Sequence, residues 1–167
     1  MAITDIYLEK VTINIGIGQN ENLLENAKAL ITKLTGHNPT ATYSKKRDPT
    51  LKLRKGQVIG TMATIRGEEA GEFLKKALDA NGNVIGKNSI ANNSLNFGVK
   101  EYIYFSGVKY DPKIGILGMN VNSTFTRKGK RVETRRRSRS SMGKKHAVIS
   151  REEILEYLKK YGIKMEE

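Results

Sequence analysis

The sequence predicts a single α+β domain in which a mainly antiparallel β-sheet is covered by helices on one face and open on the other. Three observations lead to this fold class. The expected elements follow the order β-α-β-β-α-β-β-α, the expected strands alternate apolar with polar residues, and 167 residues suffice to bury one core. Neither a linker nor a repeat divides the chain, so the domain is expected to span residues 1–167.

The first half of the chain predicts three strands and two helices. Residues 7–18 form the first strand, because Val11, Ile13, Ile15 and Ile17 share one face of it. An amphipathic helix with apolar residues from 23 to 34 ends at Gly36. A short strand over 40–43 and a longer strand over 58–66 flank a basic segment. A second helix covers residues 68–79.

The second half predicts two more strands and a last helix. Residues 80–94 are rich in Asn and Gly, which favours a long, mostly polar loop. Alternation predicts strands over 97–105 and 119–125, and a capping box of Ser150 with Glu153 starts a helix that ends at Gly162. On these assignments the open face carries Thr12, Asn14, Thr64 and either Tyr102 or Tyr104.

The net charge of +13 is concentrated in two segments. Residues 127–145 hold ten of the 30 Lys and Arg residues with one acid, and residues 45–55 hold six with one acid, so the remainder is nearly neutral. This distribution indicates a polyanionic partner that is contacted at defined places, with nucleic acid favoured over anionic lipid because no long basic amphipathic helix is present.

We name residues 43–56 the basic loop and residues 127–146, inserted before the last helix, the basic arm. Arginine is the preferred partner for bidentate contact with phosphate, and clustered like charges repel one another unless an anion lies among them. The candidate phosphate contacts are Lys45, Lys46, Arg47, Lys52, Arg54 and Lys55 in the loop, and Arg127, Lys128, Lys130, Arg131, Arg135, Arg136, Arg137, Arg139, Lys144 and Lys145 in the arm.

No catalytic, metal or cofactor site is expected, so the sequence does not predict an enzyme. The chain has no cysteine, and its two histidines, His37 and His146, are far apart with no acidic pair beside either. Gly16 and Gly18 lack the third glycine of a dinucleotide-binding turn. No apolar run is long enough to cross a membrane and no signal layout is present, so a cytoplasmic chain without a membrane partner is expected.

Several short strings together are similar to the large-subunit ribosomal protein family numbered five. In chain order they are KVTINIGIG (10–18), LTGHNP (34–39), Lys45-Lys46, LKLRKG (51–56), Ile59-Gly60, TIRG (64–67) and NFGVKE (96–101). The Arg-rich insertion, followed by His146 and a Ser-x-Glu-Glu helix start, resembles the archaeal and eukaryotic branch.

The resemblance implies a protein that binds 5S rRNA in the central protuberance of the ribosome. The family uses an Asn in the first strand, a Gln after the first helix and a Thr in the third strand. Asn14 and Thr64 match two of these, His37 stands where the Gln is usual, and Thr12 shares their face. An imidazole cannot offer the paired donor and acceptor of an amide.

Three further contacts follow from the same resemblance. The basic loop corresponds to the family's contact with the elbow of P-site tRNA, and the basic arm is expected to bind neighbouring large-subunit rRNA. Other ribosomal proteins are expected partners, among them a small-subunit head protein, for which residues 80–94 are the candidate bridge.

Two other function classes remain open at this point. A general nucleic-acid chaperone would bind 5S rRNA and an unrelated RNA about equally, so competition binding separates it from a specific rRNA-binding protein. An RNA-modifying enzyme with an RNA-binding sheet would need a nucleophile or cofactor site, which the sequence does not indicate.

Overall fold

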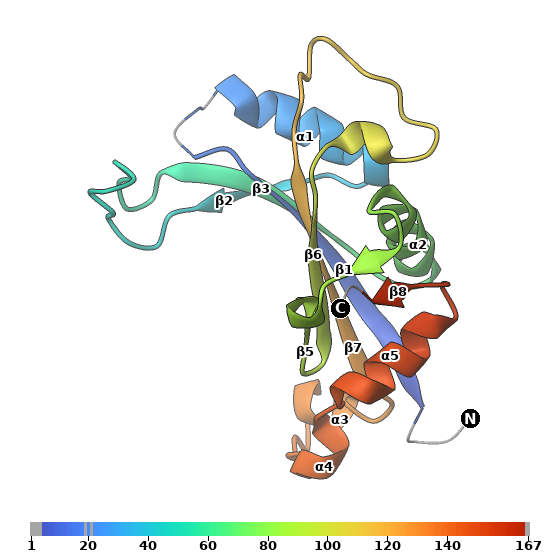
Figure 1. Ribbon diagram of the computed structural model, residues 1–167. Coiled ribbons are helices and arrows are strands. Elements are labelled where there is room, and N and C mark those ends of the chain that lie inside the picture. The colour runs from blue at the N-terminus through green and yellow to red at the C-terminus, as the bar shows by residue number, and fades with distance from the viewer. Residues whose placement is uncertain (1–4, 19, 21, 166–167) are drawn as a thin grey trace.

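A six-stranded antiparallel sheet forms the centre of the computed structural model, which describes residues 5–18, 20 and 22–165 (Figure 1). The strand order is β2-β3-β1-β7-β6-β5. The strands are β1 (Ile6–Gly16), β2 (Thr40–Tyr43), β3 (Val58–Ile65), β5 (Ile90–Ala91), β6 (Ser94–Val99) and β7 (Met119–Arg127). The predicted α+β class and the mainly antiparallel sheet are therefore confirmed.

The longer helices pack on one face of this sheet, as predicted. They are α1 (Asn22–Thr35), α2 (Glu68–Ala80) and α5 (Arg151–Lys159). The short helices α3 (Arg131–Thr134) and α4 (Lys144–Ala147) belong to the basic arm. A parallel pair of two-residue strands, β4 (Val84–Ile85) and β8 (Lys164–Met165), joins the segment after α2 to the C-terminal end of the chain.

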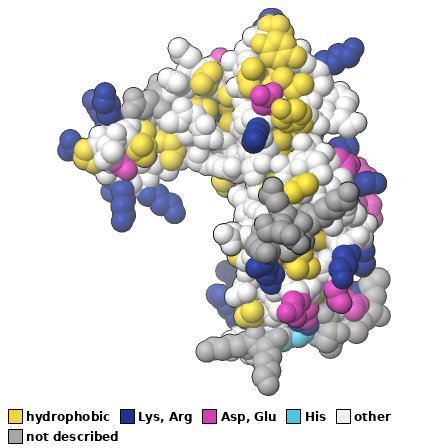
Figure 2. Space-filling model, in the orientation of Figure 1, with side chains coloured by type: hydrophobic (Ala, Val, Ile, Leu, Met, Phe, Trp, Pro, Cys, Tyr) yellow, Lys and Arg dark blue, Asp and Glu magenta, His cyan; other side chains and the backbone are white. Residues whose placement is uncertain are grey.

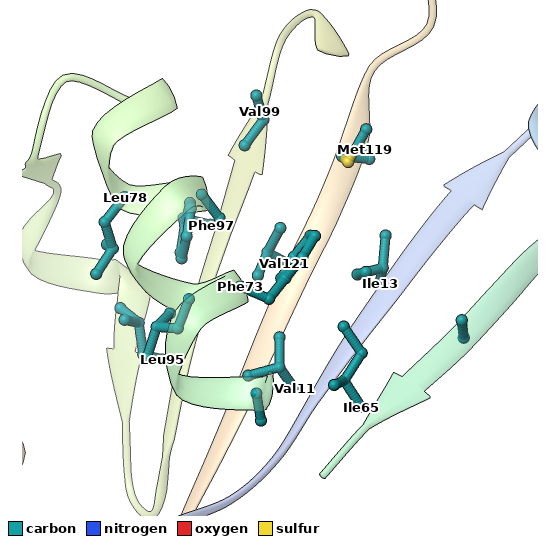
Figure 3. Close-up of a cluster of buried hydrophobic side chains, with 14 of the residues drawn as sticks. Val11, Ile13, Ile65, Phe73, Leu78, Leu95, Phe97, Val99, Met119 and Val121 are labelled. Atoms are coloured by element: carbon teal, nitrogen blue, oxygen red, sulfur yellow. The ribbon is translucent and has the colours of Figure 1, made fainter. Parts of the chain in front are cut away.

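Strand alternation decides which side chains are buried. Val11 and Ile13 of β1 and Val121 of β7 are fully buried on the face of the sheet that α2 covers, and Phe73 of α2 lies beside Val121 (Figure 3). Burying such an apolar side chain stabilises the fold by about 1.5–3 kcal/mol. Because successive residues of a strand point to opposite faces, this burial turns the intervening polar residues to the other side of the sheet.

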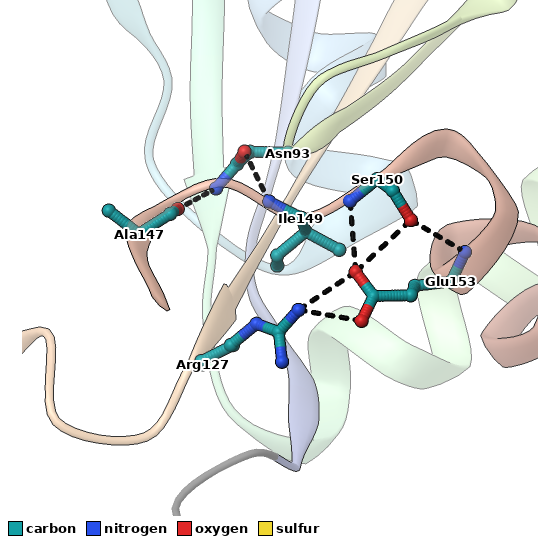
Figure 4. A network of polar contacts seen from close by, with 6 residues as sticks. All are labelled: Asn93, Arg127, Ala147, Ile149, Ser150 and Glu153. Carbon is teal, nitrogen blue, oxygen red and sulfur yellow. Dashed lines mark hydrogen bonds and ion pairs between the residues drawn. The ribbon is translucent and has the colours of Figure 1, made fainter. Parts of the chain in front are cut away.

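Two polar networks hold the C-terminal segment against the sheet (Figure 4). The side chain of Asn93 donates to the carbonyl of Ala147 at 2.8 Å and accepts from the N–H of Ile149 at 3.0 Å. The predicted capping box is present, since Ser150 and Glu153 each accept from the other's backbone N–H. Arg127 of β7 donates to both carboxylate oxygens of Glu153, at 2.6 and 2.8 Å.

The predicted loop over 80–94 is wrong, because the segment is folded. It contains β4, the 3-10 turn η1 (Lys87–Ser89), β5 and the start of β6. Ile85 and Ile90 are buried and anchor it to the core. Strands of two residues are too short to show an alternating pattern, so the sequence shows only their Asn- and Gly-rich connections.

The predicted strand over 97–105 is correct only in its first part. Strand β6 ends at Val99, and the 3-10 turn η2 (Tyr102–Tyr104) follows. Tyr102 is fully buried, and its hydroxyl accepts the N–H of Asp111 at 2.9 Å. Tyr102 and Tyr104 therefore do not lie on the open sheet face, because the chain leaves the sheet before reaching them.

Candidate nucleic-acid interface

The face of the sheet opposite the helices, here called the open face, carries mostly polar side chains and glycines. They come from the four adjacent strands β3, β1, β7 and β6 and alternate with buried residues. The residues are Lys10, Thr12, Asn14 and Gly16 of β1, Gly60, Met62 and Thr64 of β3, Asn96 and Gly98 of β6, and Asn120, Asn122 and Thr124 of β7.

Strand register arranges these residues in two rows that cross the sheet. The first row is Thr64, Thr12, Asn122 and Asn96, and the second is Met62, Asn14, Asn120 and Gly98. Neighbouring strands lie about 4.8 Å apart, so each row is a continuous line of contacts for a ligand. Within the first row the Oγ1 atoms of Thr12 and Thr64 are 3.4 Å apart.

The amides of the central strands are available to a partner. Among the described residues, no side-chain hydrogen bond engages Asn14, Asn120 or Asn122, whereas Asn96 donates to Ser94 Oγ at 3.3 Å. An amide offers both donors and acceptors. The open face is therefore an array of hydrogen-bonding groups that a polar ligand could contact.

The structure brings Asn14, Thr12 and Thr64 together, as the face assignment predicted. It places His37 elsewhere, with Nε2 lying 3.0 Å from a carboxylate oxygen of Glu69 on α2. The imidazole of His37 thus contacts the helical layer and not the two rows, and its part in RNA binding stays a prediction.

Sequence reasoning missed Asn96, Asn120 and Asn122 as members of this site. A signal was present, since Asn120 and Asn122 alternate with the apolar residues of the last strand. That pattern predicts a polar face but not its neighbours. The neighbours depend on strand order, and only the structure shows that β7 lies beside β1.

The basic loop is a hairpin that projects from the body of the molecule between β2 and β3 (Figure 1). At its base Ser44 donates its N–H to the carbonyl of Gln57, and its own carbonyl accepts the N–H of Gly56, at 2.8 and 2.9 Å. Asp48 and Leu53 exchange two backbone hydrogen bonds, and Asp48 Oδ1 accepts from the N–H groups of Thr50 and Leu51. Asp48 therefore shapes the tip of the loop.

All six predicted cations of the loop are exposed, and Figure 2 shows Lys and Arg side chains on several sides of the projection. None of the six forms an ion pair within the described residues. Arg47, Lys52 and Arg54 line one hollow of the tip together with Asp48, Pro49 and Leu53. A cluster of this kind attracts phosphate, whose charge relieves the mutual repulsion.

Two bases of the arm are engaged inside the domain, which the sequence did not predict. Arg127 is bound to Glu153 and its side chain is only 13% exposed. Lys130 Nζ lies 2.6 Å from a carboxylate oxygen of Glu9 on β1. A base held by an internal carboxylate is not free for phosphate, so these two residues anchor the root of the arm.

The outer part of the arm presents its arginines to solvent. Arg131, Arg135, Arg136 and Arg137 line one hollow, and Arg139 is exposed nearby. Glu133 holds this part folded, because its carboxylate accepts the N–H of Met142 at 2.9 Å. Lys128 is half-buried, and the side chains of Lys144 and Lys145 lie outside the described residues.

The two side chains whose pKa values are shifted belong to the last helix, away from the open face. The N–H of Ser150 and the guanidinium of Arg127 hold the pKa of Glu153 below its usual range. Burial raises the pKa of Tyr157 to about 12, and a hydrogen bond with Tyr161 contributes. Across the described part of the chain, no group of three His, Asp or Glu side chains could hold a metal ion, and no helix could span a membrane.

Comparison with known proteins identifies two family models that together match most of the chain. The model described as "Ribosomal protein L5" matches residues 3–54, and the model of the C-terminus of the same ribosomal protein family matches residues 58–159. Among similar proteins is the large ribosomal subunit protein uL5 of Sulfurisphaera tokodaii, 42% identical over 92% of this chain and 88% of its own. The uL5 proteins of Pyrobaculum aerophilum (42%, covering 93% and 87%) and Nitrosopumilus maritimus (37%, covering 95% and 92%) are also similar.

Proposed function

Because the chain belongs to the ribosomal protein L5 family, we propose that its open face binds 5S rRNA in the central protuberance of the large subunit. Family membership makes it a structural, RNA-binding constituent of the large ribosomal subunit, and the family is not one of enzymes. It also confirms the resemblance to the archaeal and eukaryotic branch of the family and the predicted localisation in the cytoplasmic ribosome.

The observation that carries the proposal is the pair of polar rows on the open face. Folded RNA presents 2′-hydroxyls, phosphates and unpaired base edges, and it is recognised largely through its shape and these groups. Asn14, Thr12 and Thr64 offer matching donors and acceptors on adjacent strands. The helices behind the sheet keep this surface rigid, so little ordering is needed when RNA binds.

Replacing Asn14 and Thr64 together by Ala tests this proposal. Two lost hydrogen bonds of about 0.5–1.5 kcal/mol each should raise the Kd for 5S rRNA about tenfold at fixed salt. The circular dichroism spectrum should not change, because both side chains are on the solvent side of the sheet. Unaltered affinity would exclude the open face as the 5S rRNA site.

Thr32→Ala with Asn88→Ala is the matched control, since both residues are exposed and lie outside the sheet. This variant should bind as the unmodified protein does. Competition with an unrelated RNA of equal length completes the experiment, because equal competition would indicate a general nucleic-acid chaperone.

The basic loop is assigned to the elbow of P-site tRNA, with Lys45, Lys46, Arg47, Lys52, Arg54 and Lys55 as the contacts. Its exposed cations are supported by a defined hairpin that holds them away from the body. Phosphate contacts carry no sequence information, which suits a site that meets every tRNA.

The basic arm is assigned to neighbouring large-subunit rRNA. Exposed guanidinium groups around one hollow favour bidentate phosphate contacts, which supports Arg131, Arg135, Arg136, Arg137 and Arg139 in this role. Arg127 and Lys130 contribute indirectly, by fixing where the arm leaves the sheet.

The contact with a small-subunit protein fits residues 104–117 better than residues 80–94. The latter bury Ile85 and Ile90, whereas Tyr104, Tyr110 and Ile116 are 56%, 53% and 64% exposed. Hydrophobic side chains gather at the corresponding end of the molecule in Figure 2. Exposed aromatic and aliphatic groups with a polar surround are typical of a protein contact.

A further inference from the structure

Two glycines on the open face, Gly16 and Gly98, have no explanation within the fold. Both are exposed, and neither has a positive φ that would disfavour a side chain. A Cβ added at Gly16 would meet no atom within 4 Å, and at Gly98 the nearest is Asn120 Oδ1 at 3.4 Å. An alanine at position 16 would therefore meet open space, and an alanine at position 98 would just touch the side-chain amide of Asn120.

Gly60 shows what a glycine required by the fold looks like on the same face. A Cβ there would lie 2.5 Å from the carbonyl oxygen of Ile15 and 2.9 Å from Thr42 Oγ1. In a strand interior, glycine costs about 0.5–1 kcal/mol relative to alanine, because it loses more conformational freedom on folding. Gly98 lies inside β6 and incurs this cost, whereas Gly16 is the last residue of β1. No intramolecular packing requires a glycine at either position.

Gly98 belongs to the row that contains Asn14 and Asn120, and Gly16 lies next to that row. Gly98 is the direct partner of Asn120 on β6. Gly16 follows Asn14 by two residues on β1 and is paired with Gly60 of β3. Glycine in a strand often marks a place where a ligand approaches the backbone closely.

We propose that Gly16 and Gly98 are contact points where the sugar–phosphate backbone of the bound RNA lies directly against the strands. This inference rests on the proposed function of the open face. A methyl group at either position would hold the RNA away from the sheet. The hydrogen bonds of Asn14 and Asn120 with the RNA would then be stretched beyond the usual range of about 2.7–3.2 Å and weakened.

Gly16→Ala and Gly98→Ala in the full chain test the proposal by titration with 5S rRNA. Each should raise the Kd about tenfold, and valine should raise it further. The urea midpoint of unfolding should stay the same or rise, because alanine is the better strand residue. The slope of log Kd against log salt should not change, since no cation is removed.

Gly71→Ala on α2 is the matched control. Its Cβ would also have room, with Tyr161 Oη nearest at 3.8 Å, but it lies in the helical layer. This variant should be more stable than the unmodified protein, with no change in affinity.

Two results would overturn the proposal. One is that both alanine variants bind 5S rRNA with unchanged affinity while the variant with Asn14→Ala and Thr64→Ala still binds more weakly. The open face would then remain the binding site, but without close contact at the two glycines. The other is a lowered urea midpoint, which would mean that the strands themselves need glycine. If the unmodified protein bound 5S rRNA and an unrelated RNA of equal length with the same affinity, the proposed function itself would be rejected.

Discussion

Asn93 illustrates how one residue can join distant parts of this chain. It lies in the turn between β5 and β6 and has a φ of 63°. Its side-chain amide forms hydrogen bonds with the backbone of Ala147 and of Ile149. Its backbone carbonyl accepts the N–H of Phe125 at 2.8 Å. Asparagine suits both tasks, because it tolerates a left-handed conformation and has a donor and an acceptor.

Asn93→Ala should lower the free energy of unfolding by about 1–3 kcal/mol, because two partly buried backbone groups lose their partner. Urea denaturation measures this loss. Asn93→Gly relieves the backbone conformation but not the lost hydrogen bonds, so it should remain destabilised. Recovery of full stability by glycine would show that only the turn conformation requires asparagine.

Glu153 is predicted to make stability depend on pH. Its pKa is lower in the folded chain than the ordinary 4.5, so the carboxylate stabilises the fold. This contribution is fully present above pH 4.5 and is lost as the pH falls through the lower, folded pKa. The difference in unfolding free energy between the unmodified protein and Glu153→Gln should therefore be constant near neutrality and shrink in acid.

Glu152→Gln serves as the control for that measurement, since it neutralises the neighbouring, exposed carboxylate of the same helix turn. Its pH profile should follow that of the unmodified protein closely. If the difference in unfolding free energy between the unmodified protein and Glu153→Gln stayed the same in strong acid, Glu153 would not stabilise the fold through its charge.

At the scale of elements, the basic loop and the open face are expected to act separately. The loop projects from the ends of β2 and β3, whereas the two rows cross the middle of the sheet. The loop is stiffened by its own backbone bonds and by Asp48. Changes to its cations should therefore leave the open face undisturbed.

Replacing Lys45, Lys46 and Arg47 by Gln should leave 5S rRNA affinity largely intact but weaken tRNA binding to reconstituted subunits. Because three phosphate contacts are lost, the slope of log K for tRNA against log salt should fall by about 2–3. The control variant has the same charge change outside the loop. In it Gln replaces three exposed bases, Arg66, Lys75 and Lys76. An equal loss of 5S rRNA binding would show that the two sites are not independent.

At the scale of the whole molecule, charge and specificity lie in different places. The arm and loop contain most of the excess positive charge, while the open face has little charge and the densest set of amides and hydroxyls. Charged segments attract any nucleic acid, whereas neutral hydrogen-bonding groups require a matching surface. Specific 5S rRNA binding should therefore depend less on salt than non-specific binding does.

Replacing Arg135, Arg136, Arg137 and Arg139 by Gln tests the arm. We expect a normal urea midpoint, since these side chains are exposed, and weaker association with large-subunit rRNA fragments. Arg127→Gln should behave differently and destabilise the fold, because it leaves Glu153 without its partner at 2.6 Å. Equal stability of both variants would reject the division between root and outer arm.

Much of the fold was predictable because its signals are local. The alternation in β1, β3 and β7, the stripes of α1 and α2, and the capping box at Ser150 each lie within a few consecutive residues. The wrong predictions lie between residues 80 and 105, and the short elements α3, α4 and β8 were not predicted. There β4 and β5 have two residues each, and the apolar pattern continues past the end of β6 into a 3-10 turn.

The sequence by itself determined the class of elements, the polar character of the open face, the position of the charge and the family resemblance. Only the tertiary structure decided that Asn96, Asn120 and Asn122 lie beside Asn14 and Thr12, and that Arg127 and Lys130 are held by Glu153 and Glu9. The physical reason is the range of the interaction. Periodicity is a property of neighbouring residues, whereas strand order and ion pairs depend on how distant segments pack.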